Sequence, residues 1–463
     1  MSKSISGPKT LPLFQLIQWI LDPIGYMEQT AKDFPDIFMS NGLSTERFVF
    51  VHHPEAIQQI LTSDRKQFAA PGEANRIIRP LVGDYSVIML SGDRHKKRRQ
   101  LLLPPFHGER MRSYADSIIE ITKSVMDALP KNQSFIARDE MQSISLQVII
   151  ETVFGLHEGE RYQDLKNLLT SMLDIFRMSS MAAILFFPSL QKDYGSWSPW
   201  GKYMRTQQII DSLLYAEIAE RRENPDPNRT DILSLLMSAR DEAGQPMSDQ
   251  ELRDELITLL FAGHETTATA MSWALYWTHH HPEIKEKILQ ELATLGTNPN
   301  PVDIARLPYL TAVCNETLRI YPVGMLTFPR IVEEPVEVMG YHLEPGVAVA
   351  GCIYLTHHRP DLYPDSKQFR PERFLERQFT PYEFMPFGGG ARRCIGEALA
   401  MFEMKLVIAT ILSRYELALA DQKPEYPRRR GVTLAPSKGV KMIMKGQREL
   451  LTSSIEQNNL VGV

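Results

Sequence analysis

One cysteine of this chain lies in a glycine-rich loop that could present its thiolate to a metal ion. Residues 387–396 are F-G-G-G-A-R-R-C-I-G, and a helical pattern follows from about Glu397 to Tyr415. The glycines let the backbone take positive φ angles and approach a flat ligand closely. N–H groups at the start of a helix stabilise a thiolate. Aimed at a haem iron, such a thiolate pushes electron density into the metal and favours O–O cleavage.

Two other interpretations explain this loop less well. A glycine-rich loop before a helix can hold phosphate, but this one lacks both G-x-G-x-x-G and the Walker lysine. A buried structural role is usual for a lone cysteine, and we expect it for Cys314 and Cys352. For Cys394 that role leaves the flanking Arg392 and the three glycines unexplained.

A second candidate site is a polar segment, residues 263–267, that interrupts an apolar helix. Ser248-x-x-Glu251 is a capping box, and the helical pattern continues from there to His280, before Pro282. At 1.5 Å per residue this helix is about 48 Å long, enough to cross a whole domain. Its middle is apolar on nearly every face, which predicts burial. The polar insertion at 263–267 therefore needs a chemical reason.

The insertion offers a path for protons. Gly263 removes a side chain where a ligand has to pass close to the helix. The Thr266 hydroxyl can bond back to the preceding turn and loosen the helix. Glu265 is an ionisable group in apolar surroundings, where an acid can shuttle protons. Splitting dioxygen requires two protons, and an acid beside an alcohol could supply them.

Other metal sites fit these residues less well. His264-Glu265 begins an H-E-x-x-H zinc motif, but the fifth position is Ala268. The run His279–His281 ends a helix just before a proline, where histidines favoured by the helix dipole or simply exposed are expected.

The remaining pattern predicts a mainly α-helical chain with a smaller β portion. Apolar spacing is helical over about residues 100–320, with a loop at 224–229, and a helix begins at Pro54. β-rich runs fall at about 35–70, with a strand at 47–52, and at about 325–450, including GVAVAGCIYLTHH. No Gly/Ser-rich or Pro-rich linker divides the chain, so we predict one large domain spanning 1–463.

Composition excludes several classes of protein. The 463 residues are 43% hydrophobic with a net charge of −5, so no general attraction to nucleic acid is expected. Three cysteines fit a reducing, cytoplasmic location better than a disulfide framework. The apolar stretch 11–24 is broken by Gln15, Gln18 and Asp22, which predicts an amphipathic surface helix and no transmembrane segment. We expect a monomer.

The motif F-x-x-G-x-R-x-C-x-G resembles the haem-binding signature of the cytochrome P450 superfamily. It is filled by Phe387, Gly390, Arg392, Cys394 and Gly396. Five fixed positions arise by chance in such a chain at a frequency on the order of one in ten thousand.

Three further segments are similar to motifs of the same family, in the same order. A-G-H-E-T-T at 262–267 resembles the helix segment at the family's oxygen site. E-x-x-R at 316–319 resembles the family's E-x-x-R helix, and P-E-R-F at 371–374 resembles its P-E-R-F segment. The resemblance covers about residues 35–445 and is greatest to bacterial members, including cyanobacterial members that accept fatty acids.

The resemblance implies the cytochrome P450 fold, with a long central helix over a haem b and a Cys394 thiolate on its iron. Glu265 and Thr266 would deliver protons to bound oxygen. Glu316, Arg319 and Arg373 would form a structural network that holds the cysteine loop. Further cofactor contacts are expected from Ala262, Gly263, Phe387, Gly388 and Gly396, and propionate contacts from His95, Arg99, Arg330 and Arg392. His95 stands where the family more commonly has tryptophan.

The implied activity is insertion of one atom of dioxygen into a lipophilic substrate such as a fatty acid, alkane, terpenoid or steroid-like molecule. Apolar substrate contacts are expected from Phe261, Ala262, Met325, Leu326 and Phe328. The stretch 172–187 contains a stripe that could line the pocket or be plain core, formed by Met178, Met181, Leu185 and Phe186.

Electrons would come from a separate ferredoxin and its reductase, because the chain carries no fused flavin or ferredoxin portion. A basic patch would steer the acidic ferredoxin, formed by Lys96, Lys97, Arg98 and Arg393. Two alternatives stay open. A peroxide-dependent peroxygenase could share this fold, although the acid–threonine pair is intact, and a non-catalytic haem sensor or carrier would need no proton relay.

Overall fold

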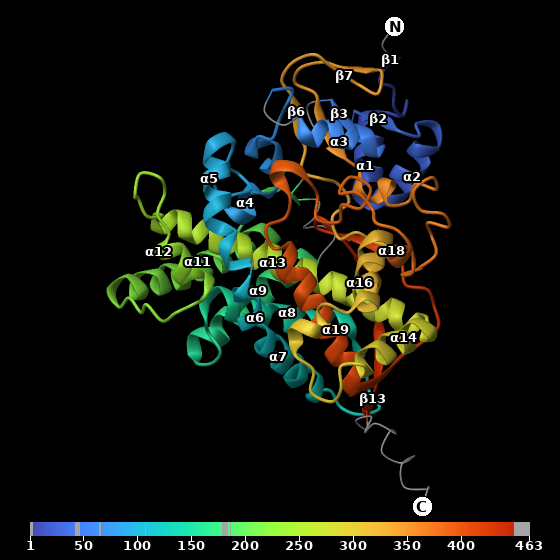
Figure 1. Ribbon diagram of the computed structural model, residues 1–463. Coiled ribbons are helices and arrows are strands. Elements are labelled where there is room, and N and C mark those ends of the chain that lie inside the picture. The colour runs from blue at the N-terminus through green and yellow to red at the C-terminus, as the bar shows by residue number, and fades with distance from the viewer. Residues whose placement is uncertain are drawn as a thin grey trace, which may run out of the picture.

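The helix α13 (Asp249–His280) crosses the middle of the molecule and contacts helices on several sides (Figure 1). The computed structural model describes residues 3–41, 47–63, 66–106, 108–177, 184–185 and 187–448. Ser248 caps α13 in the predicted capping box, with its hydroxyl accepting from Glu251 N and the Glu251 carboxylate accepting from Ser248 N. Two reciprocal bonds therefore fix where this long helix begins.

Helices make up most of the described chain. Those that surround α13 are α4 (Arg79–Val82), α8 (Ala137–Phe154), α11 (Pro199–Glu223), α12 (Ile232–Ser238), α14 (Pro282–Ala293), α16 (Pro308–Ile320) and α19 (Glu397–Arg414). The other helices are α1 (Pro12–Leu21), α2 (Pro23–Asp33), α3 (Pro54–Thr62), α5 (Gly92–Leu102), α6 (Glu109–Ser113), α7 (Ala115–Asp127), α9 (Glu160–Arg177), α15 (Pro301–Ile304), α17 (Ile353–Thr356) and α18 (Arg373–Glu376).

The largest sheet of the described residues joins the start of the chain to the segment after α16. Its order is β2 (Ile37–Ser40), β3 (Phe48–Val51), β9 (Ala348–Gly351), β6 (Arg330–Val332) and β4 (Phe68–Ala69). β3 and β9 pair in parallel, with Val49 opposite Val349, so residues about 300 positions apart share one register. This pairing fixes Arg330 on a strand next to β9.

Three smaller sheets complete the β structure of the described chain. β1 (Lys3–Ser4) pairs with β8 (Tyr341–Leu343), which pairs with β7 (Val336–Val338). β10 (Tyr415–Leu419) and β5 (Ser134–Ile136) flank β13 (Lys441–Gln447). β11 (Pro427–Arg430) and β12 (Thr433–Pro436) form a hairpin.

The predicted fold class is confirmed, with helices over most of 100–320 and strands within 35–70 and 325–450. The helices expected at Pro54, Ser248 and Glu397 and the loop at 224–229 all occur. The β-rich run GVAVAGCIYLTHH is a strand only in its first part, β9, and Ile353–Thr356 forms α17. A short apolar run does not distinguish strand from buried helix by periodicity.

A buried acid on α19 gives the core a pH-dependent element. Glu403 is buried, and this burial raises its pKa to about 8, while the Ser145 hydroxyl on α8 acts weakly in the opposite direction. The protonated carboxyl therefore prefers the folded state.

We expect Glu403→Gln to gain stability relative to the wild-type protein as the pH rises. Because the folded-state pKa lies above the ordinary value of 4.5, the carboxyl's contribution is fully present below that pH and is lost as the pH rises towards about 8. The gain should reach about 2–4 kcal/mol between about pH 5 and pH 8, measured by thermal unfolding of both proteins. Glu283→Gln, at an exposed carboxylate, should show no such trend. If the difference in the free energy of unfolding between Glu403→Gln and the wild-type protein stays constant with pH, this account is contradicted.

Candidate active site

The Cys394 sulfur lies where the cysteine loop meets the first turn of α19. The backbone N–H of Cys394 donates to Phe387 O (3.0 Å), and this bond closes the loop. The N–H groups of Gly396 and Glu397 donate to the sulfur. The side chain reaches solvent on one side, but protein encloses the sulfur on the others. Burial raises the pKa of Cys394, and the two N–H groups and the Arg99 guanidinium partly offset this.

The other two cysteines behave as the sequence predicts. Cys314 and Cys352 are fully buried, and burial raises the pKa of each thiol to about 12. Cys394 is the exposed cysteine of the three. Its sulfur is therefore the one accessible to a ligand.

Glycines shape the loop around this sulfur. Gly388 and Gly390 have φ angles of 69° and 63°, in the left-handed region that favours glycine. A Cβ atom on Gly388 or Gly396 would meet no atom within 4 Å, whereas one on Gly389 would lie 2.7 Å from Leu61 Cδ1. The loop therefore packs against α3 at Gly389 and faces open space at Gly388 and Gly396.

Arg392 ties the cysteine loop to a distant part of the chain. Its guanidinium donates to the carbonyl oxygens of Ala70 (2.6 Å), Leu90 (2.6 Å), Val87 (3.0 Å) and Ile88 (3.2 Å). Charge-assisted bonds of this kind are stronger than neutral ones. In this structure Arg392 is a clamp between the loop and residues 70–90, and its contact with a propionate stays a prediction.

The four residues predicted to contact the propionates lie close enough to interact electrostatically. The pKa of His95 is lowered to about 4, first by burial and then by the positive charges of Arg392, Arg99 and Arg330. Arg330 is fully buried and donates to Phe328 O (2.9 Å) and Gly389 O (3.2 Å). Arg99 also interacts electrostatically with Cys394. Positive charge is thus concentrated beside the sulfur, as an anionic ligand would require.

The middle of α13 opens on one face. Residues 252–258 and 267–278 are buried, but Ala262 is exposed and Phe261, Gly263, Glu265 and Thr266 are half-buried. A helix that is buried on both sides of such a segment exposes it only where another group or a cavity lies. The structure thus brings an accessible face to the predicted oxygen-site segment.

Thr266 makes the predicted back-bond, and Gly263 lies at a close helix contact. Thr266 Oγ1 donates to Ala262 O (2.6 Å). A Cβ atom on Gly263 would lie 2.8 Å from Ile149 Cδ1 on α8, so the missing side chain allows α13 to pack closely on α8. Contact between Gly263 and a cofactor stays a prediction.

Glu265 is held by α8. Its carboxylate accepts from the Arg138 guanidinium and from the Gln142 amide. Arg138 is 1% exposed, so this is an ion pair at the edge of the core. Sequence analysis missed Arg138 and Gln142. Arg138 stands in the polar start of α8, A-R-D-E-M-Q, so the pattern gave no signal that its side chain faces inward.

Glu316, Arg319 and Arg373 form a buried ionic network. Arg319 binds Glu316 through two bonds, Nε to Oε2 (2.6 Å) and Nη2 to Oε1 (2.8 Å), and Arg373 Nε donates to Glu316 Oε1 (3.2 Å). All three side chains are almost completely buried. The predicted contacts are therefore present.

His357 links this network to the cysteine loop. Arg319 Nη1 donates to His357 O (2.8 Å), and Met385 N donates to His357 Nε2 (3.0 Å), two residues before Phe387. Burial, followed by the charge of Arg319, lowers the pKa of His357 to about 3, so the ring stays a neutral acceptor. Sequence analysis did not identify this residue.

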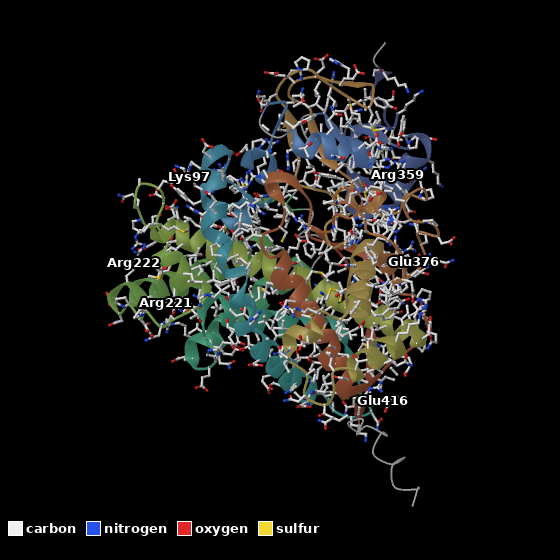
Figure 2. The ribbon with its side chains drawn as sticks, in the orientation of Figure 1. Lys97, Arg221, Arg222, Arg359, Glu376 and Glu416 are labelled. Atoms are coloured by element: carbon white, nitrogen blue, oxygen red, sulfur yellow. The ribbon has the colours of Figure 1, made fainter. Side chains whose placement is uncertain are left out.

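The predicted basic patch is smaller than expected. Arg98 is buried and forms ion pairs with Glu251 and Glu255 on α13, so placing it on the surface was wrong. A polar run on a short helix does not show which side chain faces inward. Lys97, labelled in Figure 2, pairs with Glu242 (3.0 Å). Arg393 binds Glu397 through two bonds (2.6 and 2.7 Å), and Lys96 is exposed.

The predicted substrate contacts divide into two groups. Phe261, Leu326 and Phe328 are half-buried, whereas Met325 is buried in a core group with Trp19. Leu185 is also buried in the core. Met178, Met181 and Phe186 lie outside the described residues.

The histidine run packs against aromatic rings. His280 stacks on Tyr276 and His281 on Trp277, with ring centroids 5.2 and 5.8 Å apart. Over the described residues, no group of three or more His, Cys, Asp or Glu side chains could hold a metal ion. These histidines are therefore half-buried against aromatic rings and not simply exposed.

Comparisons with known proteins place the chain in a family. The sequence pattern of the cytochrome P450 family matches residues 5–444. The chain is 35% identical over 449 residues to the protein named cytochrome P450 135B1 in Mycobacterium tuberculosis, covering 97% of this chain and 93% of that protein. It is 33% identical over 447 residues to cytochrome P450 135A1 of the same organism, covering 96% of each.

Solved structures show the same fold. The retinoic acid-bound cyanobacterial CYP120A1 has a TM-score of 0.82 at 25% identity, covering 97% of this chain and 100% of that one. The haem domain of cytochrome P450DA has a TM-score of 0.83 at 22% identity, covering 97% and 99%. The chain belongs to the cytochrome P450 family and is a haem-dependent monooxygenase.

The residues present fit a haem. An accessible sulfur receives two N–H bonds, buried cations stand beside it, and α13 exposes the predicted oxygen-site segment. These features match the three chemical parts of the cofactor: an iron that takes a thiolate, two propionates, and a flat apolar ring.

We expect Glu316→Gln to lower the free energy of unfolding by about 3–5 kcal/mol, because two buried guanidinium groups lose their carboxylate. Less haem should be retained, measured as Soret absorbance per protein together with thermal unfolding. The matched control is Glu376→Gln, at a residue labelled in Figure 2. Its exposed carboxylate pairs with Arg370, and the substitution should change stability by about 0.5 kcal/mol or less. Equal effects of the two substitutions would contradict a structural role for the buried network.

Proposed function

We propose that this chain is a haem-thiolate monooxygenase that hydroxylates a lipophilic small molecule, with Cys394 as the iron ligand of a haem b. The observation that carries the proposal is the accessible Cys394 sulfur with N–H groups of Gly396 and Glu397 directed at it. When bound, the haem supplies the activation of dioxygen by two electrons. The protein residues hold it, exclude water and move protons.

Cofactor binding would use the cations beside the sulfur. Arg99 and Arg330 lie close enough to His95 for their charges to lower its pKa, and propionates would neutralise the charge of the two arginines. His95 would stay neutral without an anion nearby, because its pKa is lowered to about 4. As a neutral ring it can donate one hydrogen bond to a carboxylate.

Proton delivery would use Thr266 and Glu265. The Thr266 hydroxyl lies on the accessible face of α13 and donates to Ala262 O, so it can rotate to pass its proton outward and take another. The Glu265 carboxylate is held by Arg138, and releasing it from this pair would let it carry a proton from solvent to Thr266 Oγ1.

The proposed substrate class rests on the apolar side chains predicted to line the pocket. Phe261 and Ala262 come from α13, and Leu326 and Phe328 from the segment before β6. Apolar pockets with few polar groups bind lipophilic ligands. The solved structure of CYP120A1 contains retinoic acid, so a terpenoid or fatty acid with a chain of that size is the first class to test.

A Thr266→Ala variant tests the proposed relay. A lipophilic ligand is first selected by its effect on the Soret band of the wild-type protein, and turnover is then followed with that ligand. We expect Thr266→Ala to bind haem normally but to form at least about tenfold less product per electron pair, releasing hydrogen peroxide instead. Thr267→Ala is the matched control, since Thr267 Oγ1 makes the same type of bond, to Gly263 O (2.8 Å). Fully coupled turnover by Thr266→Ala would contradict the relay, and product formation from peroxide alone would favour a peroxygenase.

Electrons would come from an acidic ferredoxin reduced by its reductase. Arg98 is buried, so we choose the exposed Lys96 as the residue of the predicted basic patch to substitute. We expect Lys96→Glu to slow reduction by a plant-type ferredoxin about tenfold at low ionic strength, and added salt should reduce this difference. The matched control is Lys202→Glu on α11. A wild-type reduction rate that does not depend on salt would contradict electrostatic steering.

A further inference from the structure

The outward face of α1 is apolar. Five side chains of this short helix and its N-cap are between 41% and 70% exposed, namely Leu11, Leu13, Phe14, Ile17 and Leu21. We call them the α1 stripe. No charged residue occurs from Thr10 to Leu21. The sequence analysis expected an amphipathic surface helix; in the structure its polar residue Gln15 is buried, and Gln18 is exposed beside the stripe.

The buried side of α1 holds this orientation in place. Gln15 is 1% exposed, and its amide donates to Thr10 O (2.8 Å) and Pro8 O (3.1 Å). Its side-chain oxygen accepts from Ser40 Oγ (3.2 Å) and Asn41 N (3.1 Å). Turning α1 over would break these bonds and take Gln15 away from Ser40 Oγ and Asn41 N, which is costly. The stripe is therefore fixed towards solvent.

Positive charge borders the stripe. Lys9 is exposed two residues before Leu11. Arg429 of β11 lies over the Trp19 ring (4.6 Å) on the buried side of α1, and the neighbouring Arg428 is exposed. Asp22 follows the stripe and accepts from Gly25 N as the cap of α2. Cations beside an apolar helical face complement the headgroups of an anionic membrane.

We propose that the α1 stripe docks this protein on the surface of an anionic lipid bilayer. α1 has ten residues, about 15 Å, so it would lie flat in the headgroup region. In the described part of the chain no helix is long and apolar enough to cross a membrane. A face this short offers much less than the roughly 800 Å² per partner that a stable protein interface buries, which argues against a second copy of the chain as occupant.

The test is co-sedimentation of the purified haem-loaded protein with vesicles. One set contains about one third phosphatidylglycerol in phosphatidylcholine, and the other is phosphatidylcholine alone. We expect binding to the anionic set, with at least about tenfold weaker binding for the double variant Leu13→Asp/Phe14→Asp. Lys9→Glu/Arg428→Glu should remove the preference for phosphatidylglycerol.

The matched control is Ile209→Asp/Tyr215→Asp, which places the same two negative charges at exposed apolar residues on α11, away from α1 in Figure 1. It should bind as the wild-type protein does. A second measurement uses Phe14→Trp, whose added fluorescence should shift to the blue with anionic vesicles. The proposal is overturned if the wild-type protein stays in the supernatant, or if the double variant binds equally well. It is also overturned if, without lipid, sedimentation velocity shows a dimer that the double variant lacks.

Discussion

The position of one sulfur atom depends on contacts from several distant parts of the chain. Cys394 receives N–H bonds from the first turn of α19, so the start of that helix fixes where the sulfur points. Arg392 clamps the loop to residues 70–90. Arg319, paired with Glu316, reaches the loop through His357 and Met385. Each of these contacts restricts the loop from another direction, so a flat ligand meets a preformed site.

The opposite side of the site is built by the packing of two helices. Gly263 lets α13 approach Ile149 on α8, and from α8 Arg138 and Gln142 hold Glu265. The same approach leaves Ala262 and Thr266 accessible on another face of α13. Close helix packing therefore determines both where the acid is held and where the hydroxyl can act. The outward stripe on α1 is a separate feature, fixed by Gln15, and would bring the molecule to the phase that holds lipophilic compounds.

Local patterns were enough to predict much of this arrangement. The capping box of α13, the Thr266 back-bond and the Glu316–Arg319 pair involve residues at most four apart, so spacing alone indicates them. Partners that arrive from distant elements could not be predicted in this way. Arg98 looked like a surface cation but pairs with Glu255, 157 residues later. The close contact of Gly263 with Ile149 on α8 was likewise not predicted. A single sequence does not show which side chain of a polar run faces inward.

The thiolate assignment of Cys394 is tested most directly by the absorption spectrum of the reduced protein with carbon monoxide. A thiolate opposite the gas donates charge to the iron, and we predict the strongly red-shifted Soret band of such an adduct. Single changes of Cys314 or Cys352 to Ala should keep that band, because both thiols are buried in the core, and Cys394→Ser should remove it. A folded, haem-loaded wild-type protein without the band, or a Cys394→Ser variant that retains it, would contradict the account.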